Sequence, residues 1–511
     1  MSSDIRLSSP AGRWVLLATV LGSGMALVDS TVVNVALPRI GAEFGASMAG
    51  LQWTVNAYTL TLAGFVLLGG SLGDRFGRRR VFLIGVVWFA LASALCAAAQ
   101  DIPMLIAARA LQGVGGALLT PGALAIIQAS FTPDDRPRAV GAWSGLGGIA
   151  GAAGPFLGGW LVGVAGWRWV FLLNLPLAVL VIAVTARHVP ETSDESAHGR
   201  FDVLGAVLAA AALAGITYAL TEAPTHTANR ALVILAAVAG IAAAVWFVLV
   251  ERRRSHATTG PQPMLPAQVF RSRQFTAVNA VTFVVYGAMG VVFFLLPLTL
   301  QVVSGFSPIL AGAAMLPVTV VMLLLSSPAG GLAQRIGPRI PMTVGLAVAA
   351  AGMLLMLRVG RTSTYPGTVL PAVLVFGLGL AAMVAPLTAT VLASADPQHA
   401  GIASGVNNAV ARAAGLLGVA AIPPLAGLAG EAYTDPALFA SGFHRAIVVC
   451  AVTMLAGAAL TVLTVSDDTL RTAPESAAPQ CRTHCAIAAP PLDRVPAQDR
   501  GDSGGASPSR P

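Results

Sequence analysis

The 511-residue sequence contains no lysine and has few charged residues of any kind. All 30 residues in the Lys+Arg count are arginines, and charged residues make up only 10% of the chain. A P-loop needs a lysine on the nucleotide phosphates, and Schiff-base catalysis needs a lysine amine. The absence of lysine therefore excludes ATP-driven pumping through a P-loop, and it excludes pyridoxal chemistry in this chain.

Cysteine is also scarce, with four residues in the whole sequence. Cys96 and Cys450 lie in apolar runs, so no disulfide framework is expected. Cys481 and Cys485 flank His484 in a polar tail, but a lone cluster without a second ligand pair is weak evidence for a metal. We expect no metal and no cofactor. The net charge of +8 comes from arginines that stand mostly in short loops between apolar runs, which argues against nucleic-acid binding.

Hydrophobic residues make up 56% of the sequence, and the mean hydropathy is +0.78, which is typical of an integral membrane protein. A helix needs about 20 mostly apolar residues to cross the hydrocarbon core of a bilayer. Runs of this length lie at 14–36, 50–72, 81–99, 104–127, 139–164, 169–186, 202–222, 231–250, 275–300, 309–332, 340–357, 367–392, 401–428 and 444–465. The sequence therefore predicts an all-α membrane fold with fourteen transmembrane helices.

The distribution of arginine predicts the orientation of these helices. If the N-terminus is cytoplasmic, the inner loops and the N-terminal segment hold about three times as many arginines as the outer loops. Arg358 and Arg361 are exceptions, because they fall on the outer side. We therefore expect a multi-pass protein of the cell membrane with both termini in the cytoplasm, and we expect a monomer.

An internal repeat predicts the division into domains. Aligning Gly70–Gly85 with Gly330–Gly345 gives six identities in sixteen positions, including the pairs Arg75/Arg335 and Arg79/Arg339. A duplicated six-helix unit with an inserted pair explains this repeat, and parallel repeats are common in secondary transporters. The predicted parts are an N-terminal six-helix bundle (1–199), an inserted helix pair (200–260), a C-terminal six-helix bundle (261–465) and a disordered cytoplasmic tail (466–511).

Four stretches carry a family resemblance. They are Gly73–Arg80 (GDRFGRRR), Asp29–Pro38 (DSTVVNVALP), Arg109–Gly115 (RALQGVG), and Gly145 followed by Gly154–Gly159 (GPFLGG). Together they resemble the motifs of the major facilitator superfamily, and more narrowly those of its fourteen-helix drug:proton antiporters of the multidrug and antibiotic-export type. This resemblance implies two six-helix bundles plus two inserted helices, and an exporter of drugs that is coupled to protons.

Two charged residues inside apolar runs are the predicted proton-coupling residues. Asp29 stands in the outer half of the first run, where an unneutralised carboxylate is costly, and we expect it to load and release a proton. The alternative is a hydrated or helix-capping position. Arg109 should face a central cavity and bias a neighbouring carboxylate between its protonation states. The alternative for Arg109 is an interface arginine at a misplaced helix end.

Polar and aromatic side chains in the spans are candidates for the substrate cavity. They are Asn34, Trp53, Tyr58, Gln112, Trp143, Tyr286, Asn407, Asn408 and Arg412. Each aromatic ring could equally face lipid or the membrane interface. The group around Arg412 could line the cavity or anchor the inner end of its helix.

The loop at Gly73–Arg80 is the predicted conformational latch. An inner-loop carboxylate can accept hydrogen bonds from a nearby helix N-terminus and pair with arginines, which would lock the two bundles together on the cytoplasmic side. Its predicted members are Gly73, Asp74, Arg75, Gly77, Arg78 and Arg79. Gln334 and Pro338 replace Asp74 and Arg78 in the second copy, so only the first copy should form the full charge network.

The fifth apolar run is the predicted antiporter helix. Gly145, Gly154, Gly158 and Gly159 allow another helix to approach closely, and Pro155 removes a backbone hydrogen bond, which should kink the helix. Such a helix between the bundles can act as a hinge and as a seal against proton leak. The alternative is generic packing in a chain rich in glycine.

The predicted function is proton-coupled export of small hydrophobic or amphipathic drugs, with the lipid bilayer and protons as the other partners and no nucleic acid. One alternative is an importer or facilitator of a small organic nutrient or siderophore. A membrane enzyme is disfavoured, because the sequence shows no metal-ligand set, no Ser/His/Asp cluster and no paired carboxylates within the spans. A sensor without transport activity is also disfavoured, because both halves and the charged loop are present.

Overall fold

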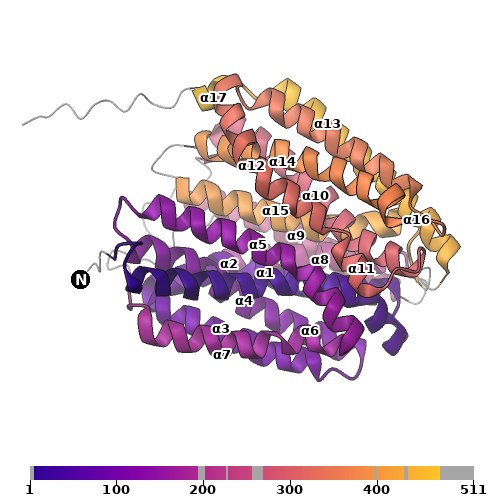
Figure 1. Cartoon of the computed structure of the whole chain (residues 1–511), viewed down its shortest axis with the longest axis horizontal. Helices are drawn as coiled ribbons and strands as arrows, with labels where there is room; N and C mark the ends of the chain where they lie inside the picture. The colour runs from indigo at the N-terminus through magenta and orange to yellow at the C-terminus, as the bar shows by residue number, and fades with distance from the viewer. Residues whose placement is uncertain are drawn as a thin grey trace, which may run out of the picture. The chain divides into compact units, whose positions relative to one another are not determined.

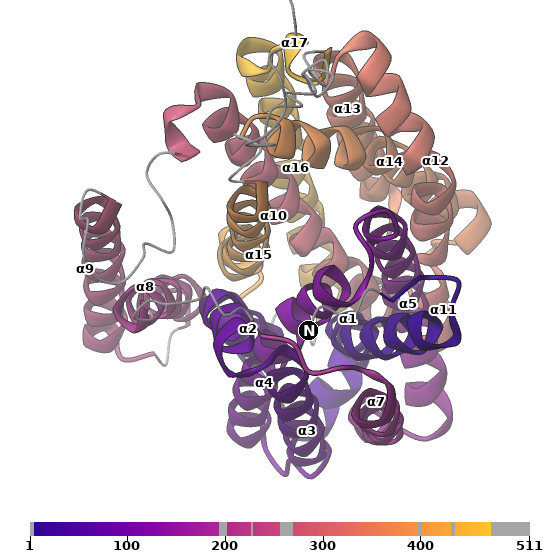
Figure 2. The same cartoon turned by 90° about the vertical axis from the view of Figure 1, so that its left-hand side faces the viewer.

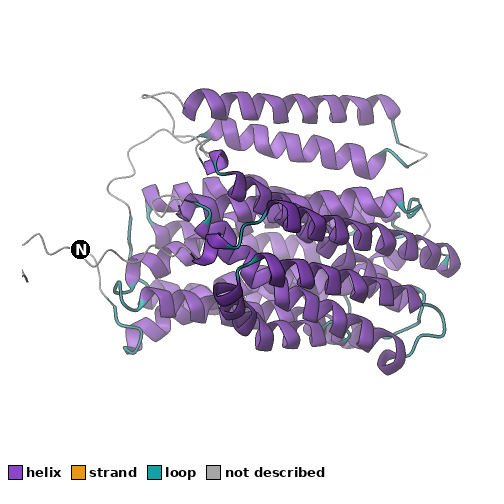
Figure 3. Cartoon of the chain, turned by 90° about the horizontal axis from the view of Figure 1, so that it is seen from above, coloured by secondary structure: helices purple, strands orange, loops and turns teal. Residues whose placement is uncertain are grey.

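The computed structural model describes residues 5–193, 202–225, 228–255, 269–395, 400–430 and 435–471. Within these residues the chain is helical, and Figure 3 shows helices and loops with no strand. The predicted all-α fold class is confirmed. Cys481, His484, Cys485 and most of the predicted tail lie outside the described residues.

The first half of the chain contains seven helices (Figure 1). They are α1 (Pro10–Phe44), α2 (Met48–Phe76), α3 (Arg78–Ala97), α4 (Ile102–Ser130), α5 (Arg136–Val164), α6 (Arg168–Leu172) and α7 (Asn174–His188). The helices α8 (Val203–Glu222) and α9 (Arg230–Ser255) follow. The second half contains α10 (Arg273–Val302), α11 (Pro308–Ala313), α12 (Leu316–Ile336), α13 (Arg339–Leu355), α14 (Leu370–Ala393), α15 (Ala400–Leu425), α16 (Pro436–Thr464) and the short α17 (Asp468–Arg471).

Thirteen of the described helices are long and apolar enough to cross a membrane, or fourteen if the bent α2 counts as one span. Each of the fourteen predicted spans corresponds to one of these helices or to consecutive short ones, such as α6 and α7. The sequence did not predict the bend of 49° in α2, which falls between Val66 and Leu68.

Short polar residues begin several of these helices. Ser9, Ser47 and Asp101 each accept a hydrogen bond from a backbone amide three residues later, at the start of α1, α2 and α4. This satisfies amides that have no partner inside the helix. The left-handed residue Gly45 ends α1 (φ 58°). The apolar runs therefore form separate helices with defined ends, and the loops between them are short.

The helices pack as one group in each half, and α8 and α9 form a pair at the side of the first group. In the first half α4 packs against α2 and α3, and α1 packs against α5; in the second half α14 packs against α12 and α13, and α10 packs against α15. Figure 2 shows α8 beside α2, with α9 on the outside of α8. The predicted domain boundaries stay a prediction, because contacts also join the halves.

An ion pair joins the start of α8 to the end of α9. The carboxylate of Asp202 caps α8 through the Gly205 amide and accepts a hydrogen bond from Arg254 at the end of α9. Burial favours a higher pKa for Asp202, but hydrogen bonds with Glu251, Arg254 and Gly205 outweigh it and lower the pKa below its ordinary value. Most of α9 exposes apolar side chains, as expected for a helix that faces lipid.

The helix α5 runs as one helix through Pro155 and packs closely against both halves. A Cβ atom added to Gly154 would lie 2.0 Å from Thr31 Oγ1 of α1, and one added to Gly159 would lie 2.3 Å from the Pro308 carbonyl oxygen. Gly158 approaches Val32 of α1 in the same way. A Cβ atom at Gly145 would meet no atom within 4 Å. The glycines near Pro155 are therefore needed for packing, whereas Gly145 is not.

We predict that Gly154→Val lowers the thermal stability of the protein. The new side chain would overlap Thr31 and push α5 from α1, and overpacking of this kind costs about 1–3 kcal/mol. The measurement is the midpoint of thermal unfolding in detergent. Gly145→Val is the matched control, and its midpoint should equal that of the wild type. Equal midpoints for all three proteins would show that the α1–α5 contact does not limit stability.

Candidate functional site

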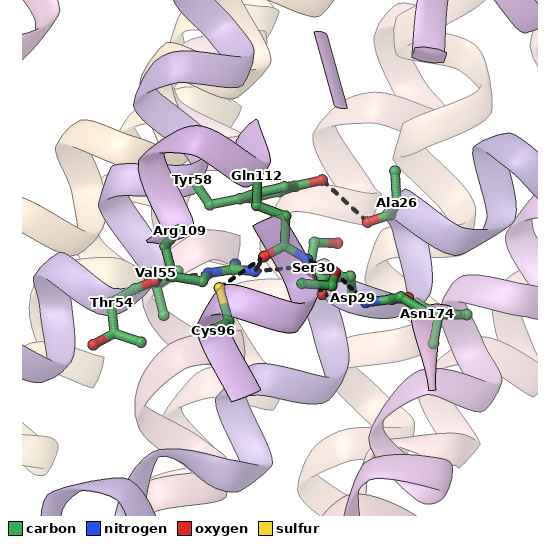
Figure 4. A network of polar contacts seen from close by, with 12 residues as sticks. Ala26, Asp29, Ser30, Thr54, Val55, Tyr58, Cys96, Arg109, Gln112 and Asn174 are labelled. Atoms are coloured by element: carbon green, nitrogen blue, oxygen red, sulfur yellow. Dashed lines mark hydrogen bonds and ion pairs between the residues drawn. The ribbon is translucent and has the colours of Figure 1, made fainter. Parts of the chain in front are cut away.

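An ion pair is buried among the helices of the first half. Arg109 Nη1 of α4 lies 2.5 Å from Asp29 Oδ2 of α1, and each residue is 1% exposed (Figure 4). Burial of both charges is tolerated only when each charge is paired and hydrogen-bonded. The structure therefore brings together the two predicted proton-coupling residues, and the hydrated or capping alternative for Asp29 does not fit this burial.

Two amide side chains hold the other oxygen of the Asp29 carboxylate. Gln112 Nε2 donates to Asp29 Oδ1 at 2.8 Å, and Asn174 Nδ2 donates to the same atom at 2.9 Å. Both amides also donate to the Ser93 hydroxyl oxygen of α3. We call Asp29, Arg109, Gln112, Asn174 and Ser93 the Asp29 cluster. Its members come from α1, α3, α4 and α7, so the cluster depends on the packing of all four helices.

Residues of α2 also contact the guanidinium of Arg109. Arg109 Nε donates to the Thr54 carbonyl oxygen at 3.1 Å, and its Cζ lies 4.3 Å from the centre of the Tyr58 ring. Tyr58 is 2% exposed, and its hydroxyl donates to the Ala26 carbonyl oxygen at 3.3 Å. Tyr58 and Gln112, predicted to line the substrate cavity, therefore pack around the ion pair.

The sequence reasoning missed Asn174 and Ser93. Both are uncharged polar residues inside apolar runs, and such residues are common enough in membrane helices to carry little signal. Asn174 is the first residue of α7, directly after the break that separates α7 from α6. This position directs its amide towards Asp29. The break between the two helices was the missing signal, and it is visible only in the structure.

A first cavity lies between α1 and α5 of the first half and α10 and α12 of the second. We call this cavity of about 540 Å³ the α1–α5 cavity. Asn34, Gly145 and Pro155 contribute to its lining, together with apolar side chains such as Phe293 and Met315. The predicted antiporter helix therefore forms one wall of a cavity between the halves.

A second cavity, of about 400 Å³, lies among α10, α14 and α15, and we call it the Arg412 cavity. Tyr286, Asn407, Asn408 and Arg412 line it, so the structure brings these four predicted residues together. Asn407 Nδ2 donates to Thr282 Oγ1 of α10 at 2.9 Å. Arg412 lies near the middle of α15, which does not fit the alternative of an anchor at the helix end.

The two predicted tryptophans lie elsewhere. Trp53 Nε1 donates to Glu222 Oε1 of α8 at 3.0 Å, and its ring lies 6.1 Å from that of Tyr218. Trp143 Nε1 donates to the Ser23 hydroxyl of α1 at 2.8 Å. Neither lines the two cavities described above. Trp53 instead joins the inserted helix α8 to α2.

The predicted latch forms the turn between α2 and α3. Arg78 pairs with Asp74 at 2.7 Å, and the Gly77 amide donates to the Gly73 carbonyl oxygen at 3.1 Å. Gly77 has a φ of 105°, which favours glycine. Arg75 contacts the Phe76 ring. These contacts stay within the first half of the chain.

A carboxylate that the sequence reasoning missed fastens this turn. Glu191, just after α7, accepts hydrogen bonds from the backbone amides of Arg79 and Arg80 at 3.0 and 3.1 Å. Arg79 Nη1 also donates to the Val189 carbonyl oxygen at 3.1 Å. The amides at the start of α3 thus bind a carboxylate, as the helix dipole favours. The latch is therefore attached to the end of α7.

The second copy of the repeat has the same contact. The Arg339 amide donates to Asp467 Oδ1, just after α16, at 3.2 Å, and Gly337 has a φ of 92°. Asp467 thus takes the place that Glu191 holds in the first copy. The repeat found in the sequence therefore corresponds to two similar turns, each fastened by an acid from the end of a later helix.

Direct hydrogen bonds join the two halves near the end where α1 stops and α2 begins. They run from Gln52 Nε2 to the Val419 carbonyl oxygen (2.5 Å), from Gln301 Nε2 to the Val35 carbonyl oxygen (3.0 Å) and from the Met48 amide to the Gly430 carbonyl oxygen (2.8 Å). The contact of Gly159 with Pro308 adds to them. The two halves are therefore fastened at this end of the helices.

The sequence is similar to those of known transport proteins. A profile described as the Major Facilitator Superfamily matches residues 19–203 and 199–419. A puromycin resistance protein of Streptomyces alboniger is 37% identical over 84% of this chain and 86% of the relative. A tetracenomycin C resistance and export protein of Streptomyces glaucescens is 34% identical over 82% and 77%, and a multidrug resistance protein of Mycobacterium tuberculosis is 35% identical over 77% and 72%.

Solved structures with low sequence identity share the fold. A bacterial homologue of the lysosomal transporter Spinster, in an inward-facing conformation, matches 91% of this chain and 98% of its own, with a TM-score of 0.63 and 17% identity. A D-xylose–proton symporter matches 89% and 98%, with a TM-score of 0.61 and 16% identity. These likenesses show the arrangement of the helices and carry no information about the substrate.

We predict that Arg109→Gln strongly destabilises the protein and that Asp29→Asn in the same chain restores most of the loss. The single change leaves a buried carboxylate without its counter-charge, which costs about 3–5 kcal/mol, whereas the double change leaves two neutral groups that can hydrogen-bond. Thermal unfolding in detergent at pH 7 measures this effect.

The control for this prediction is Arg138→Gln. Its side chain is 80% exposed and lies 3.9 Å from Asp135, so it should leave the midpoint unchanged. A double variant no more stable than Arg109→Gln would mean that pairing of the two charges does not explain the loss.

Proposed function

The chain belongs to the major facilitator superfamily, and on this premise we propose that it exports hydrophobic or amphipathic drugs in exchange for protons. The observation that carries the proposal is the buried Asp29–Arg109 pair, beside a cavity between the halves. The named relatives are resistance and export proteins, and they match most of this chain. These similarities favour export over uptake.

The proposed coupling step is a change of charge at Asp29. As a carboxylate it forms the ion pair with Arg109 and accepts from Gln112 and Asn174. Protonation removes the negative charge and leaves Arg109 without a counter-charge in a region of low dielectric constant. The two protonation states therefore favour different arrangements around the guanidinium. A difference of this kind lets protonation bias the equilibrium between conformations.

Asp29 lies in α1, and α1 also packs against α5, one wall of the α1–α5 cavity. Thr31, two residues from Asp29, donates to the Gly151 carbonyl oxygen of α5 at 3.2 Å. A shift of α1 after protonation would therefore move the wall of the cavity. This contact supports communication between the proton site and a drug bound between the halves.

The proposed topology places both termini in the cytoplasm of a monomer in the cell membrane. In this orientation the hydrogen bonds between the halves would lie near the outer surface, and the arrangement would be inward-facing. The latch would then engage the second half only when the cytoplasmic side closes. The predicted six-helix bundles on either side of the inserted pair would move relative to each other.

Proton entry supplies enough free energy for export. One charge that moves inward through about 150 mV releases roughly 3.5 kcal/mol. This is enough for a gradient of a few hundredfold in a neutral drug. Proton exchange can therefore drive export without hydrolysis of ATP.

We predict that Asp29→Asn abolishes drug-dependent proton movement. The purified chain is placed in liposomes with a pH-sensitive dye inside, and tetracenomycin C is added as the probe. Asparagine keeps the shape and hydrogen-bonding capacity of Asp29 but cannot take up a proton, so the wild type should change the internal pH and the variant should not.

Asp101→Asn is the matched control, because Asp101 is an exposed cap of α4 and asparagine caps equally well. It should behave as the wild type. Export that continues at the same rate after the pH difference and the voltage are collapsed would disprove proton coupling.

A further inference from the structure

We propose that the exported compounds carry a negative charge that binds to Arg412 of α15 in the Arg412 cavity. This inference rests on the proposed export function and names the class of its substrates: amphipathic organic anions. It depends on where Arg412 stands in its helix, on its partners, and on the lining of the two cavities.

Arg412 stands too deep in the membrane to reach water along the helix. It follows the start of α15 at Ala400 by twelve residues, which is about 18 Å of helix, and Leu425 at the other end is about as far away. An arginine reaches the interface by extending its side chain only when it lies near a helix end. The guanidinium must therefore find its partners in the protein or in the cavity that it lines.

The partners of Arg412 leave its charge uncompensated. Its Nε donates to Asn408 Oδ1 at 2.9 Å, and no carboxylate of the described residues lies within 4.0 Å of it. Arg109, the other arginine in the middle of a span, is paired with Asp29 at 2.5 Å. The arginine that is fully buried is thus neutralised by the protein, whereas Arg412, which is half-buried and borders a cavity, is not. A charge left uncompensated at this depth is a functional site by default.

The cavity around Arg412 supplies further hydrogen-bond donors and no acid. Tyr286, Thr388, Ser404 and Asn408 line it, and each has a hydroxyl or amide group. A carboxylate or phenolate could accept from the guanidinium, whose planar donors match a carboxylate in a bidentate arrangement. A cation at the same place would face Arg412 with no negative group to balance it.

The apolar part of the ligand has a place beside this site. Tyr286 of the Arg412 cavity and Phe293 of the α1–α5 cavity are seven residues apart on α10, so they lie on the same face and about 10 Å apart along the helix. The α1–α5 cavity is lined by apolar side chains, hydroxyls and an amide, with no charged residue. A ligand with an acidic group at one end and a hydrophobic body fits this pair of cavities.

An anionic substrate also changes the charge balance of exchange. One anion leaves the cell and one proton enters it, and each of these movements makes the inside of the cell more positive by one charge. An inside-negative voltage therefore drives both the exit of the anion and the entry of the proton. With a neutral drug, the voltage drives only the entry of the proton.

Binding of three probes with the same ring system tests the inference. They are 9-anthracenecarboxylate, 9-anthracenemethanol and 9-anthracenemethylammonium, which are anionic, neutral and cationic at pH 7. Fluorescence anisotropy measures their binding to the full chain in lipid nanodiscs, with empty nanodiscs subtracted. We expect the carboxylate to bind about tenfold more tightly than the alcohol, because a hydrogen bond to a charged group is worth that much, and the ammonium to bind most weakly.

Substitutions at Arg412 test the origin of this preference. Arg412→Gln should weaken binding of the carboxylate about tenfold and leave the alcohol unchanged, and Arg412→Lys should keep part of the preference. Arg358→Gln is the matched control, because it makes the same chemical change at an exposed arginine. It should bind all three probes as the wild type does.

Several results would overturn the inference. They are equal binding of the three probes by the wild type, carboxylate binding that survives Arg412→Gln, and an equal loss in Arg358→Gln. The wild-type comparison needs no variant, so it decides the matter even if Arg412→Gln fails to fold. None of these results affects the export proposal, which the liposome experiment tests separately through its dependence on the proton gradient.

Discussion

The low dielectric constant of the membrane interior makes every buried charge costly, and the architecture of the first half depends on how one pair of charges is accommodated. Asp29 and Arg109 are almost completely buried, and their pairing uses groups from α1, α2, α3, α4 and α7. A shift of any of these helices would leave a polar atom without its partner. The ion pair therefore ties the packing of the first half to the protonation state of a single carboxyl group.

The second half accommodates the charge within its span differently. Arg412 has a neutral partner, Asn408, and borders a cavity. The repeat in the sequence would suggest two halves with similar chemistry, but the polar groups of the two halves have diverged. The first half provides a closed cluster around a single carboxyl group, and the second provides a cavity lined by an arginine without an acidic partner. Under the proposed function, this division would let proton and drug exchange without competing for the same side chain.

The sequence predicted the fold well, because long apolar runs can satisfy their backbone groups in a membrane only as helices. It also identified Asp29 and Arg109, since a charge inside an apolar run is a strong signal. It did not reveal that Asn174 completes the cluster or that Trp53 binds Glu222, because these contacts join residues more than a hundred positions apart. Pairing between distant helices follows from how the helices pack, and the composition of each helix says little about it.

One contact occurs in both turns of the repeat, and a charge pair occurs in only one of them. In both copies a carboxylate at the end of a later helix accepts a hydrogen bond from a backbone amide just after the glycine turn. The acceptor is Glu191 in the first copy and Asp467 in the second. Only the first copy has the Asp74–Arg78 pair, since Gln334 and Pro338 stand at those positions in the second. The contact shared by both turns therefore serves to hold each turn to its own half. In the proposed topology, the charges found in the first turn alone would be the ones available to engage the opposite half when the cytoplasmic side closes.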